Sequence, residues 1–309
     1  MRITTLGILL AAVIAAPAYP QADQTQSNRP VRIATYKVKP GSIAAFEDVM
    51  KKHREAHKKA GREFFMVWRG FMGDRYEFTT MTAISGLGVY DGPNPFVQAF
   101  GEGGAVALQN RLDQCLDGST AQLWHLHPDQ SIVSAQDFQY ARVVDMVLRS
   151  DSAGLEHSAM QRKVVGAQGA AGMKNFWTLN LDYGGDDYRI LYITPVDNLS
   201  ALAAAPNLTK LMGAAEAAKI SAAREQSTLS RRPYIWSYRP ELSYRNLDTV
   251  ARAADRFTRS WRLNLAKSPV IARSATSSES TTGKNDGSVV NVNSITVSPD
   301  GQIRTGRRL

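Results

Sequence analysis

The chain has 309 residues and a hydrophobic fraction of 43%, which is enough to bury one large core or two small ones. Its formal net charge is +9, but the segment from Arg245 onward holds eleven Lys and Arg against five Asp and Glu, a local excess of +6. The excess is scattered, and no helix-turn-helix, zinc-finger or aromatic-basic motif accompanies it, so we expect no nucleic-acid partner.

The N-terminal segment, 1–18, has the pattern of a signal peptide. Arg2 supplies the positive start, an apolar run extends from Leu6 to Ala16, and Ala16-Pro17-Ala18 offers small residues for cleavage. The run is shorter than the about 20 apolar residues that span a bilayer, and an uncleaved anchor is the alternative. We therefore expect a periplasmic or secreted protein with a polar leader at residues 19–30.

Residues 41–82 read helix, strand, turn, strand, and the rest of the chain is organised around this stretch. The helix has one apolar arc at about 100° per residue, formed by Ile43, Ala45, Phe46, Val49, Met50, Ala56 and Ala60. Ser42 can cap its start, and Gly61 can end it in a left-handed conformation. His53 and His57 lie one turn apart inside the apolar arc, which is the most unusual local feature of the sequence.

The first half of the chain, residues 31–130, contains four predicted strands and two predicted helices. Gly73-Asp74 forms a hairpin turn between the second and third strands, and glycines interrupt the second helix at residues 101–104. In order, we predict a strand at 31–39, the helix that follows Gly41, strands at 64–72 and 75–83, a helical stretch that ends near 116, and a strand at 121–127. The order β-α-β-β-α-β is that of a ferredoxin-like unit.

The same order returns in the second half, residues 138–244. We predict a strand at 140–149, a helix at 154–171, strands at 175–183 and 188–194, a helix at 207–229 and a strand at 233–239. Several positions match between the halves at a nearly constant spacing along the chain, among them Leu123-Trp124 with Ile235-Trp236 and Gly73-Asp74 with Gly185-Asp186. Such matches in the right order indicate an internal duplication.

With this order and this repeat, the chain resembles the dimeric α+β barrel superfamily, which includes antibiotic-biosynthesis-type monooxygenases, EthD-like proteins and haem-handling members. The resemblance covers about residues 31–244 and rests on topology rather than on a signature motif. It implies two tandem ferredoxin-like sheets that face each other and form a pseudo-dimeric α+β barrel within one chain. It also implies a ligand pocket, either inside the barrel or between a sheet and its helices, but no single chemistry.

The hydrophobic pattern of the strands agrees with a barrel. Helices cover one face of each sheet, so an apolar second face needs a partner. The strand at 64–72 is apolar on both faces, since Phe65, Val67 and Phe71 alternate with Phe64, Met66 and Trp68. The second half repeats this less completely. We expect four tryptophans to form or support the pocket wall: Trp68, Trp124, Trp177 and Trp236.

The pair His53 and His57 allows several interpretations. Two imidazoles at i and i+4 can ligate one metal ion or flank a haem. Arg54 stands where an HExxH motif needs Glu, and the counterparts in the second half are Val164 and Gln168. Position 53 therefore belongs to a core face that tolerates His. We expect both residues to be structural or to contact a ligand in the pocket, and we predict no metal site.

His125 and His127 alternate along a strand, so they point to the same face. Their counterparts, Ser237 and Arg239, are also polar. This face is either solvated or lines the pocket. If it lines the pocket, His125 is the best candidate for a catalytic general base, because an unperturbed His titrates near pH ~6.5, and His127 would be a second contact.

The basic tail, residues 245–309, lies outside both repeats. Apolar residues at helical spacing between Leu247 and Leu265 predict a helix that either docks on the barrel or contacts a surface or partner. The following stretch, from Ser274 to Asn293, is rich in Ser, Thr, Gly and Asn and predicts partial disorder. Cys115 is the single cysteine, and its apolar neighbours at helical spacing indicate a buried, inert thiol.

Three functions remain open from the sequence. The leading hypothesis is an exported α+β barrel protein that holds a small, largely apolar ligand. The alternatives are an oxygenase-like or haem-handling enzyme of the same superfamily, and a structural or interaction protein that acts through its basic tail. The sequence determines neither the cofactor nor the oligomeric state.

Overall fold

A computed structural model of the chain describes residues 29–246, 296–297 and 303–304. The predicted signal peptide, the leader up to residue 28 and the predicted helix and Ser/Thr-rich part of the tail lie outside the described residues. The chain divides into two units after Asn264. In the second unit, β10 (Thr296–Val297) and β11 (Ile303–Arg304) form a short antiparallel pair. None of the described helices is long and apolar enough to cross a membrane.

The first half forms an antiparallel sheet in the order β4-β1-β3-β2. Its elements, in chain order, are β1 (Arg29–Val38), α1 (Ile43–Lys59), β2 (Phe64–Met72), β3 (Glu77–Ala83), α2 (Pro95–Cys115) and β4 (Leu116–Leu126). Both helices connect strands that are not neighbours, and they lie on the same face of the sheet, because they contact each other and share one buried cluster. The predicted order of elements is therefore present in this half.

The second half forms an antiparallel sheet in the corresponding order β8-β5-β7-β6. Its elements are β5 (Tyr140–Leu148), α3 (Asp151–Ala170), β6 (Trp177–Tyr183), β7 (Arg189–Val196), α4 (Leu199–Ala204), α5 (Leu208–Met212), α6 (Ala214–Ser227) and β8 (Thr228–Tyr238). A further short strand, β9 (Tyr244–Arg245), pairs with the start of β2.

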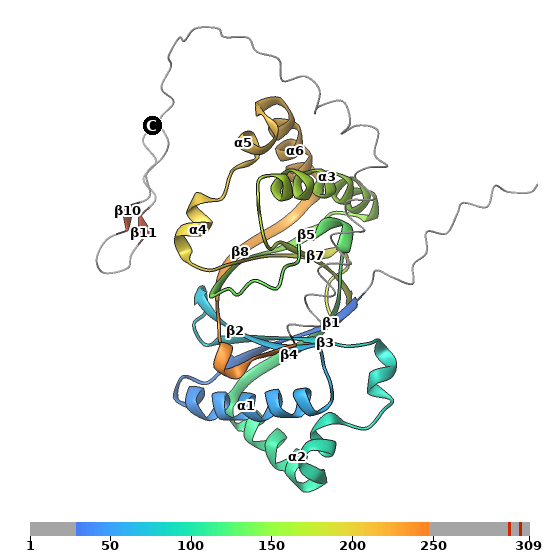
Figure 1. Cartoon of the computed structure of the whole chain (residues 1–309), viewed down its shortest axis with the longest axis vertical. Coiled ribbons are helices and arrows are strands. Elements are labelled where there is room, and N and C mark those ends of the chain that lie inside the picture. Colours follow the sequence, from blue (N-terminus) through green and yellow to red (C-terminus); the bar gives the residue numbers. More distant parts are fainter. Residues whose placement is uncertain (1–28, 247–295, 298–302, 305–309) are drawn as a thin grey trace, which may run out of the picture. The chain divides into compact units, whose positions relative to one another are not determined.

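Two pairings between the halves close the sheets into an antiparallel barrel of eight strands, with β9 added beside β2 (Figure 1). β4 pairs with β6, where His125 lies opposite Asn180, and β2 pairs with β8, where Trp68 lies opposite Tyr238. The mixed α+β barrel predicted from the sequence is thus confirmed. Closure leaves none of the eight barrel strands with an unpaired edge, which is how barrels avoid the exposed backbone groups of an open sheet.

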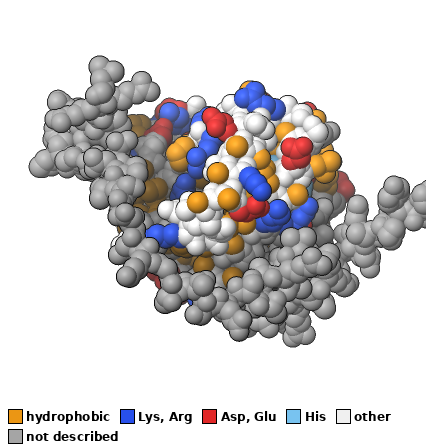
Figure 2. Space-filling model, turned by 90° about the horizontal axis from the view of Figure 1, so that it is seen from above, with side chains coloured by type: hydrophobic (Ala, Val, Ile, Leu, Met, Phe, Trp, Pro, Cys, Tyr) orange, Lys and Arg blue, Asp and Glu red, His pale blue; other side chains and the backbone are white. Residues whose placement is uncertain are grey.

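The helices cover the outside of the barrel on two sides, α1 and α2 against the first half and α3 with α6 against the second (Figure 1). Beneath α1 and α2, a buried cluster includes Tyr36, Phe46, Val67, Phe78 and Leu112. A smaller cluster of the second half includes Val165 of α3 and Phe176. Viewed from the side of α5 and α6, charged and hydrophobic side chains are interspersed on the described surface (Figure 2).

The helix α1 shows how the local sequence sets its limits. A short 3-10 turn at Pro40–Ser42 precedes it, and Ser42 makes no side-chain cap, contrary to expectation. At the other end, Gly61 has φ 68°, the left-handed conformation expected from the sequence. The face that packs on the sheet is the predicted one, because Phe46, Val49 and Met50 are fully buried.

The helical region after β7 differs from the prediction of one helix over 207–229. Two helices, α5 and α6, replace it, and α4 precedes them as an additional helix. α5 and α6 meet at Gly213, whose φ of 81° no helix interior allows. Asn207 caps α5 by accepting a hydrogen bond from the Lys210 N–H at 2.9 Å. The expected break in α2 is present, since Gly101 has the non-helical angles φ 73° and ψ 170°.

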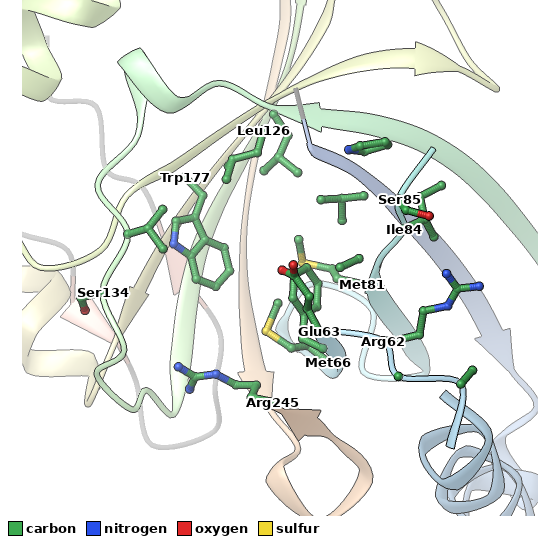
Figure 3. A pocket seen from close by; sticks show the side chains of 18 residues that line it. Arg62, Glu63, Met66, Met81, Ile84, Ser85, Leu126, Ser134, Trp177 and Arg245 are labelled. Atoms are coloured by element: carbon green, nitrogen blue, oxygen red, sulfur yellow. The ribbon is translucent and has the colours of Figure 1, made fainter. Parts of the chain in front are cut away.

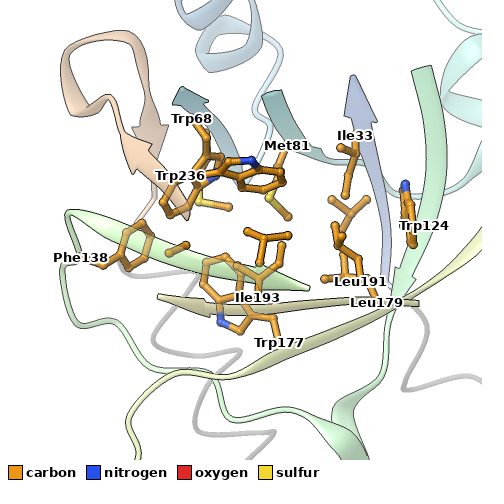
Figure 4. Packing of buried hydrophobic residues seen from close by; sticks show 14 residues of the cluster. Ile33, Trp68, Met81, Trp124, Phe138, Trp177, Leu179, Leu191, Ile193 and Trp236 are labelled. Carbon is orange, nitrogen blue, oxygen red and sulfur yellow. The ribbon is translucent and has the colours of Figure 1, made fainter. Parts of the chain in front are cut away.

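The barrel interior holds the largest apolar cluster, to which both halves contribute (Figure 4). Trp68 and Trp236 approach each other at 6.1 Å between ring centroids, and Phe138 stacks on Trp68 at 5.2 Å. The other buried members of this cluster are Val31, Ile33, Met66, Met81, Trp124, Ala141, Val143, Trp177, Leu179, Leu191 and Ile193. The inward faces of the two sheets therefore pack against each other.

One end of the interior is filled by an ion cluster around Asp145 rather than by apolar side chains. Asp145 is 3% exposed and accepts two hydrogen bonds from Arg189, from Nε at 2.8 Å and Nη2 at 2.7 Å. Arg232 Nη2 donates to the same carboxylate at 3.1 Å, and the Tyr234 hydroxyl lies at 3.5 Å. Asp145 is buried because three donors satisfy its two oxygens.

We expect Asp145→Ala to destabilise the barrel by about 3–5 kcal/mol, because it leaves Arg189 half-buried without its partner. The matched control is Asp48→Ala, whose carboxylate is 53% exposed and pairs with Lys51, and which should cost less than about 1 kcal/mol. Urea unfolding of both variants measures the difference. Equal losses in the two variants would show that the ion cluster does not support the barrel.

Candidate functional site

A cavity of about 550 Å³ opens at the end of the barrel opposite the Asp145 cluster. Its apolar wall consists of inward-facing residues near the ends of five barrel strands, namely Val31, Phe64, Met66, Met81, Ala83, Leu126, Trp177 and Leu179. The loop between α1 and β2 and the segment after β3 contribute Ala60–Phe64 and Ala83–Ser85 (Figure 3). The walls are therefore mostly apolar and come from both halves.

Charged side chains line the same cavity (Figure 3). Arg62 and Glu63 precede β2, and Arg245 belongs to β9. The Nε atom of Arg62 is buried and has no hydrogen-bond partner among the described residues. Arg245 lies over the Phe138 ring at 4.6 Å and makes long contacts of 3.4 Å with Asp137 and Ala135. Two guanidinium groups thus lie at a cavity whose described lining contains one carboxylate.

Of the four tryptophans predicted to form or support the pocket wall, Trp177 lines the cavity. Trp68, Trp124 and Trp236 belong to the interior cluster and are 0%, 1% and 6% exposed. None of these three lines the cavity, and Arg189 of the Asp145 cluster contacts the Trp124 ring at 5.7 Å. Three of the four residues therefore pack in the barrel interior rather than at the cavity wall.

His53 and His57 do not line the cavity. They face the outer side of the first sheet from α1, where His57 stacks on Phe65 at 4.8 Å and His53 contacts Phe96 of α2 at 4.5 Å. The reason is strand parity: Phe64 and Met66 point into the barrel, so Phe65 points to the helices. Of the interpretations that the sequence allowed, the contacts of His53 fit that of a histidine packed in the core.

Burial lowers the pKa of His53 to about 3 and that of His57 to about 4, and nearby cationic groups, including Arg32, lower both pKa values further. Both imidazoles are therefore neutral in the folded chain at neutral pH. The unfolded chain takes up these protons more easily, so the associated stability is fully present above pH ~6.5 and declines as the pH falls towards 4.

We expect a variant with His53→Leu and His57→Leu to lose less stability on acidification than the parent. The difference should develop between pH ~6.5 and ~4 and reach the order of 3 kcal/mol per histidine, because neither leucine takes up a proton. Urea unfolding at several pH values measures it. Parallel curves for the two proteins would contradict the assignment of neutral buried imidazoles.

His125 and His127 also lie outside the cavity. Trp124 and Leu126 of the same strand pack into the barrel interior, so the histidines point to the outer face of β4. There His125 Nδ1 lies 2.5 Å from Asp182 Oδ1, and its Nε2 lies 2.8 Å from His127 Nε2. His125 therefore has no access to a ligand in the cavity, and a general-base role for it on such a ligand is not supported by this position.

The cavity residues that the sequence did not single out include Arg62, Glu63, Met81 and Arg245. Alternation along β2 identified Phe64 and Met66 as one face but not as the inward one. Arg62 and Arg245 lie at strand ends, where no periodicity assigns a face, and Arg245 reaches the cavity because β9 pairs with β2. Arg245 could not be placed at the cavity from the sequence, because nothing in the sequence indicated that Tyr244–Arg245 pairs with Phe64–Phe65.

The cavity lining does not fit a haem held by the ligands that proteins commonly use. Haem iron takes His, Cys, Tyr or Met as axial ligand. None of the described residues that line the cavity carries an imidazole, thiol or phenol, and Met66 and Met81 offer only thioethers. Cys115 is buried in the helix layer, where its thiol donates to the Arg111 carbonyl at 3.2 Å. Within the part of the chain that the structure describes, no three His, Cys, Asp or Glu side chains are grouped so as to hold a metal ion.

Comparison with known proteins gives similarity of fold alone. No protein-family model matches the chain, and no curated protein matches it. A candidate monooxygenase from Lactobacillus acidophilus NCFM is 11% identical and has a TM-score of 0.51, over 68% of this chain and 94% of that one. A candidate monooxygenase from Fusobacterium nucleatum is 9% identical with a TM-score of 0.47, over 69% and 93%. The chlorite dismutase of Candidatus Nitrospira defluvii is 12% identical with a TM-score of 0.41, over 75% and 96%.

Proposed function

We propose that this chain binds a small, largely apolar molecule in the cavity at the open end of the barrel. The observation that carries the proposal is the cavity itself, with about 550 Å³ and walls of Val, Phe, Met, Leu and Trp side chains. Pockets for small molecules typically enclose about 300–1,000 Å³ and are lined mainly by apolar and aromatic groups. Burial of apolar surface, at about 25 cal/mol per Å², would supply the affinity.

The charged groups of the lining indicate what else the ligand carries. Arg62 has a buried Nε without a hydrogen-bond partner among the described residues, and Arg245 makes long contacts of 3.4 and 3.5 Å to the Asp137 carboxylate and the Gln136 carbonyl. A guanidinium group forms short, charge-assisted hydrogen bonds with a carboxylate, sulfonate or phosphate. An apolar molecule with one anionic group at its edge therefore fits this lining best.

A catalytic role is the alternative. The L. acidophilus protein named as a candidate monooxygenase has this fold, but at 11% identity the likeness transfers no reaction. In the cavity, Glu63 is the carboxylate of the described lining, and it would be the residue to accept a proton from a bound substrate. Consumption of oxygen by the protein with a bound ligand, lost in Glu63→Gln, would favour the enzyme over the binding protein.

The proposal is tested by filling the cavity. We expect the full chain to bind one equivalent of anilinonaphthalene sulfonate, an apolar aromatic anion, with enhanced fluorescence. Ala83→Phe places a ring in the cavity and should weaken binding at least about 10-fold, whereas Val106→Phe adds the same ring to an exposed site on α2, at a residue that is 61% exposed, and should leave binding unchanged.

Arg62→Gln serves as a second arm, since it keeps most of the side-chain length but removes the charge, and should weaken binding of the anion by about 10-fold. Circular dichroism shows that each variant is folded. Equal binding by the parent, Ala83→Phe and Arg62→Gln would place the probe elsewhere on the protein and overturn the proposal.

We also propose that the two halves are tandem ferredoxin-like repeats, residues 31–130 and 138–244. The matching strand orders β4-β1-β3-β2 and β8-β5-β7-β6 support this, together with the sequence matches at a nearly constant spacing between the halves. A role of the basic tail in contacting a surface or partner is a further proposal, and it rests on sequence alone.

Export is proposed from the pattern of the N-terminal segment, 1–18. In a Gram-negative host, the mature chain should begin at Tyr19 by mass spectrometry and be found in the periplasm. Leu9→Arg breaks the apolar run and should retain the uncleaved chain in the cytoplasm. Recovery of the parent with an intact Met1 to Ala18 segment in the cytoplasm would contradict the proposal.

A further inference from the structure

The outer face of the seam between β4 and β6 carries an arrangement of imidazoles that the cavity does not use. His125 and His127 approach each other through their Nε2 atoms, which are 2.8 Å apart, and their rings are tilted by 58° with centroids at 4.5 Å. Their side chains are 18% and 23% exposed, so small ions reach them from solvent. Because these histidines point away from the barrel interior, the arrangement is separate from the proposed ligand site.

The carboxylate beside His125 orients one of the two Nε2 atoms. Asp182 lies 2.5 Å from Nδ1 of His125, and because an ionised carboxylate only accepts, Nδ1 is the protonated nitrogen of that ring. Nε2 of His125 therefore carries a lone pair that faces Nε2 of His127. Asp129 lies 3.9 Å from Nδ1 of His127, beyond hydrogen-bond distance, so the tautomer of His127 is not fixed by it. Either a proton on Nε2 of His127 or a metal ion fits between the two nitrogen atoms.

The residues around the pair add to this arrangement. Asn180 lies directly opposite His125 across the β4–β6 pairing, and its Oδ1 atom is buried without a hydrogen-bond partner among the described residues. Side chains directly opposite in an antiparallel pair are neighbours on one face. Arg162 of α3 donates to Asp129 at 3.0 Å, which fixes that carboxylate beside His127. A buried oxygen acceptor without a described partner thus belongs to the residue opposite His125 on the same face of the seam.

We infer that His125 and His127 bind a divalent transition metal ion of the Ni²⁺, Cu²⁺ or Zn²⁺ type through their Nε2 atoms at this seam. Imidazole nitrogen suits these ions. Asp182 holds the Nδ1–H side of His125, as carboxylates do behind metal-bound histidines. Water and the Asn180 oxygen fill the remaining positions. With metal–nitrogen bonds of about 2.0–2.1 Å, a tetrahedral ion needs the two Nε2 atoms about 3.3 Å apart. A small rotation of either ring widens the present Nε2–Nε2 separation of 2.8 Å to this value.

Zinc titration of the full chain, made without a histidine tag and freed of metal by a chelator, tests the site. All five histidines of the chain are described, and the tail contains none. Isothermal titration calorimetry should show one equivalent of Zn²⁺ bound. His125→Ala and His127→Ala should each weaken binding at least about 10-fold, and Asp182→Asn, which keeps both imidazoles, should weaken it about 10-fold. Cu²⁺ in place of Zn²⁺ should show coupling to two imidazole nitrogens by electron paramagnetic resonance, and to fewer in either His→Ala variant.

The matched control is the variant with His53→Leu and His57→Leu, which removes the other close imidazole pair and should bind Zn²⁺ as the parent does. The altered seam residues are partly exposed, and circular dichroism verifies that their variants fold. No binding of Zn²⁺ by the parent would mean that a proton bridges the two imidazoles and would overturn the metal site. Unchanged binding in both His125→Ala and His127→Ala would overturn it as well.

Discussion

The structure depends on the burial of strands that are apolar on both faces. In β2, Phe65 and Val67 pack under the helices while Phe64, Met66 and Trp68 point into the barrel. One sheet with helices on one side would expose the second set to water, at a cost of about 1.5–3 kcal/mol for each large side chain. Pairing of β4 with β6 and of β2 with β8 removes this exposure. The same closure creates a lined interior and the end at which the cavity lies.

Much of this architecture could be predicted from the sequence, because periodicity identifies elements and the faces of elements. The helix α1, the two hairpins and the barrel follow from such patterns, and so does the presence of Trp177 at a pocket. Periodicity does not decide which of two apolar faces points inward. For that reason the sequence left His53 and His57 open as structural or ligand-contacting residues, and the structure packs them between α1 and Phe65. The burial of Asp145 also escaped prediction, since its partners Arg189 and Arg232 lie 44 and 87 residues away.

The polar groups of the protein are divided among separate regions. The described lining of the cavity has guanidinium groups and no imidazole, the helix layer holds neutral histidines, and the outer seam joins two imidazoles to two carboxylates. Such a division explains why the fold alone does not define a reaction. The barrel supplies a dry interior and a rigid frame, and the chemistry depends on which side chains stand at the strand ends.

The two ends of the barrel interior are not equivalent. Asp145, Arg189 and Arg232 fill one end with paired charges, and the buried side chains of the interior cluster pack between them and the cavity at the other end. The barrel interior therefore has one open end and does not form a tunnel. A molecule that occupies it must leave by the route through which it came, so exchange is sequential, and an occupant that dissociates slowly excludes every later one.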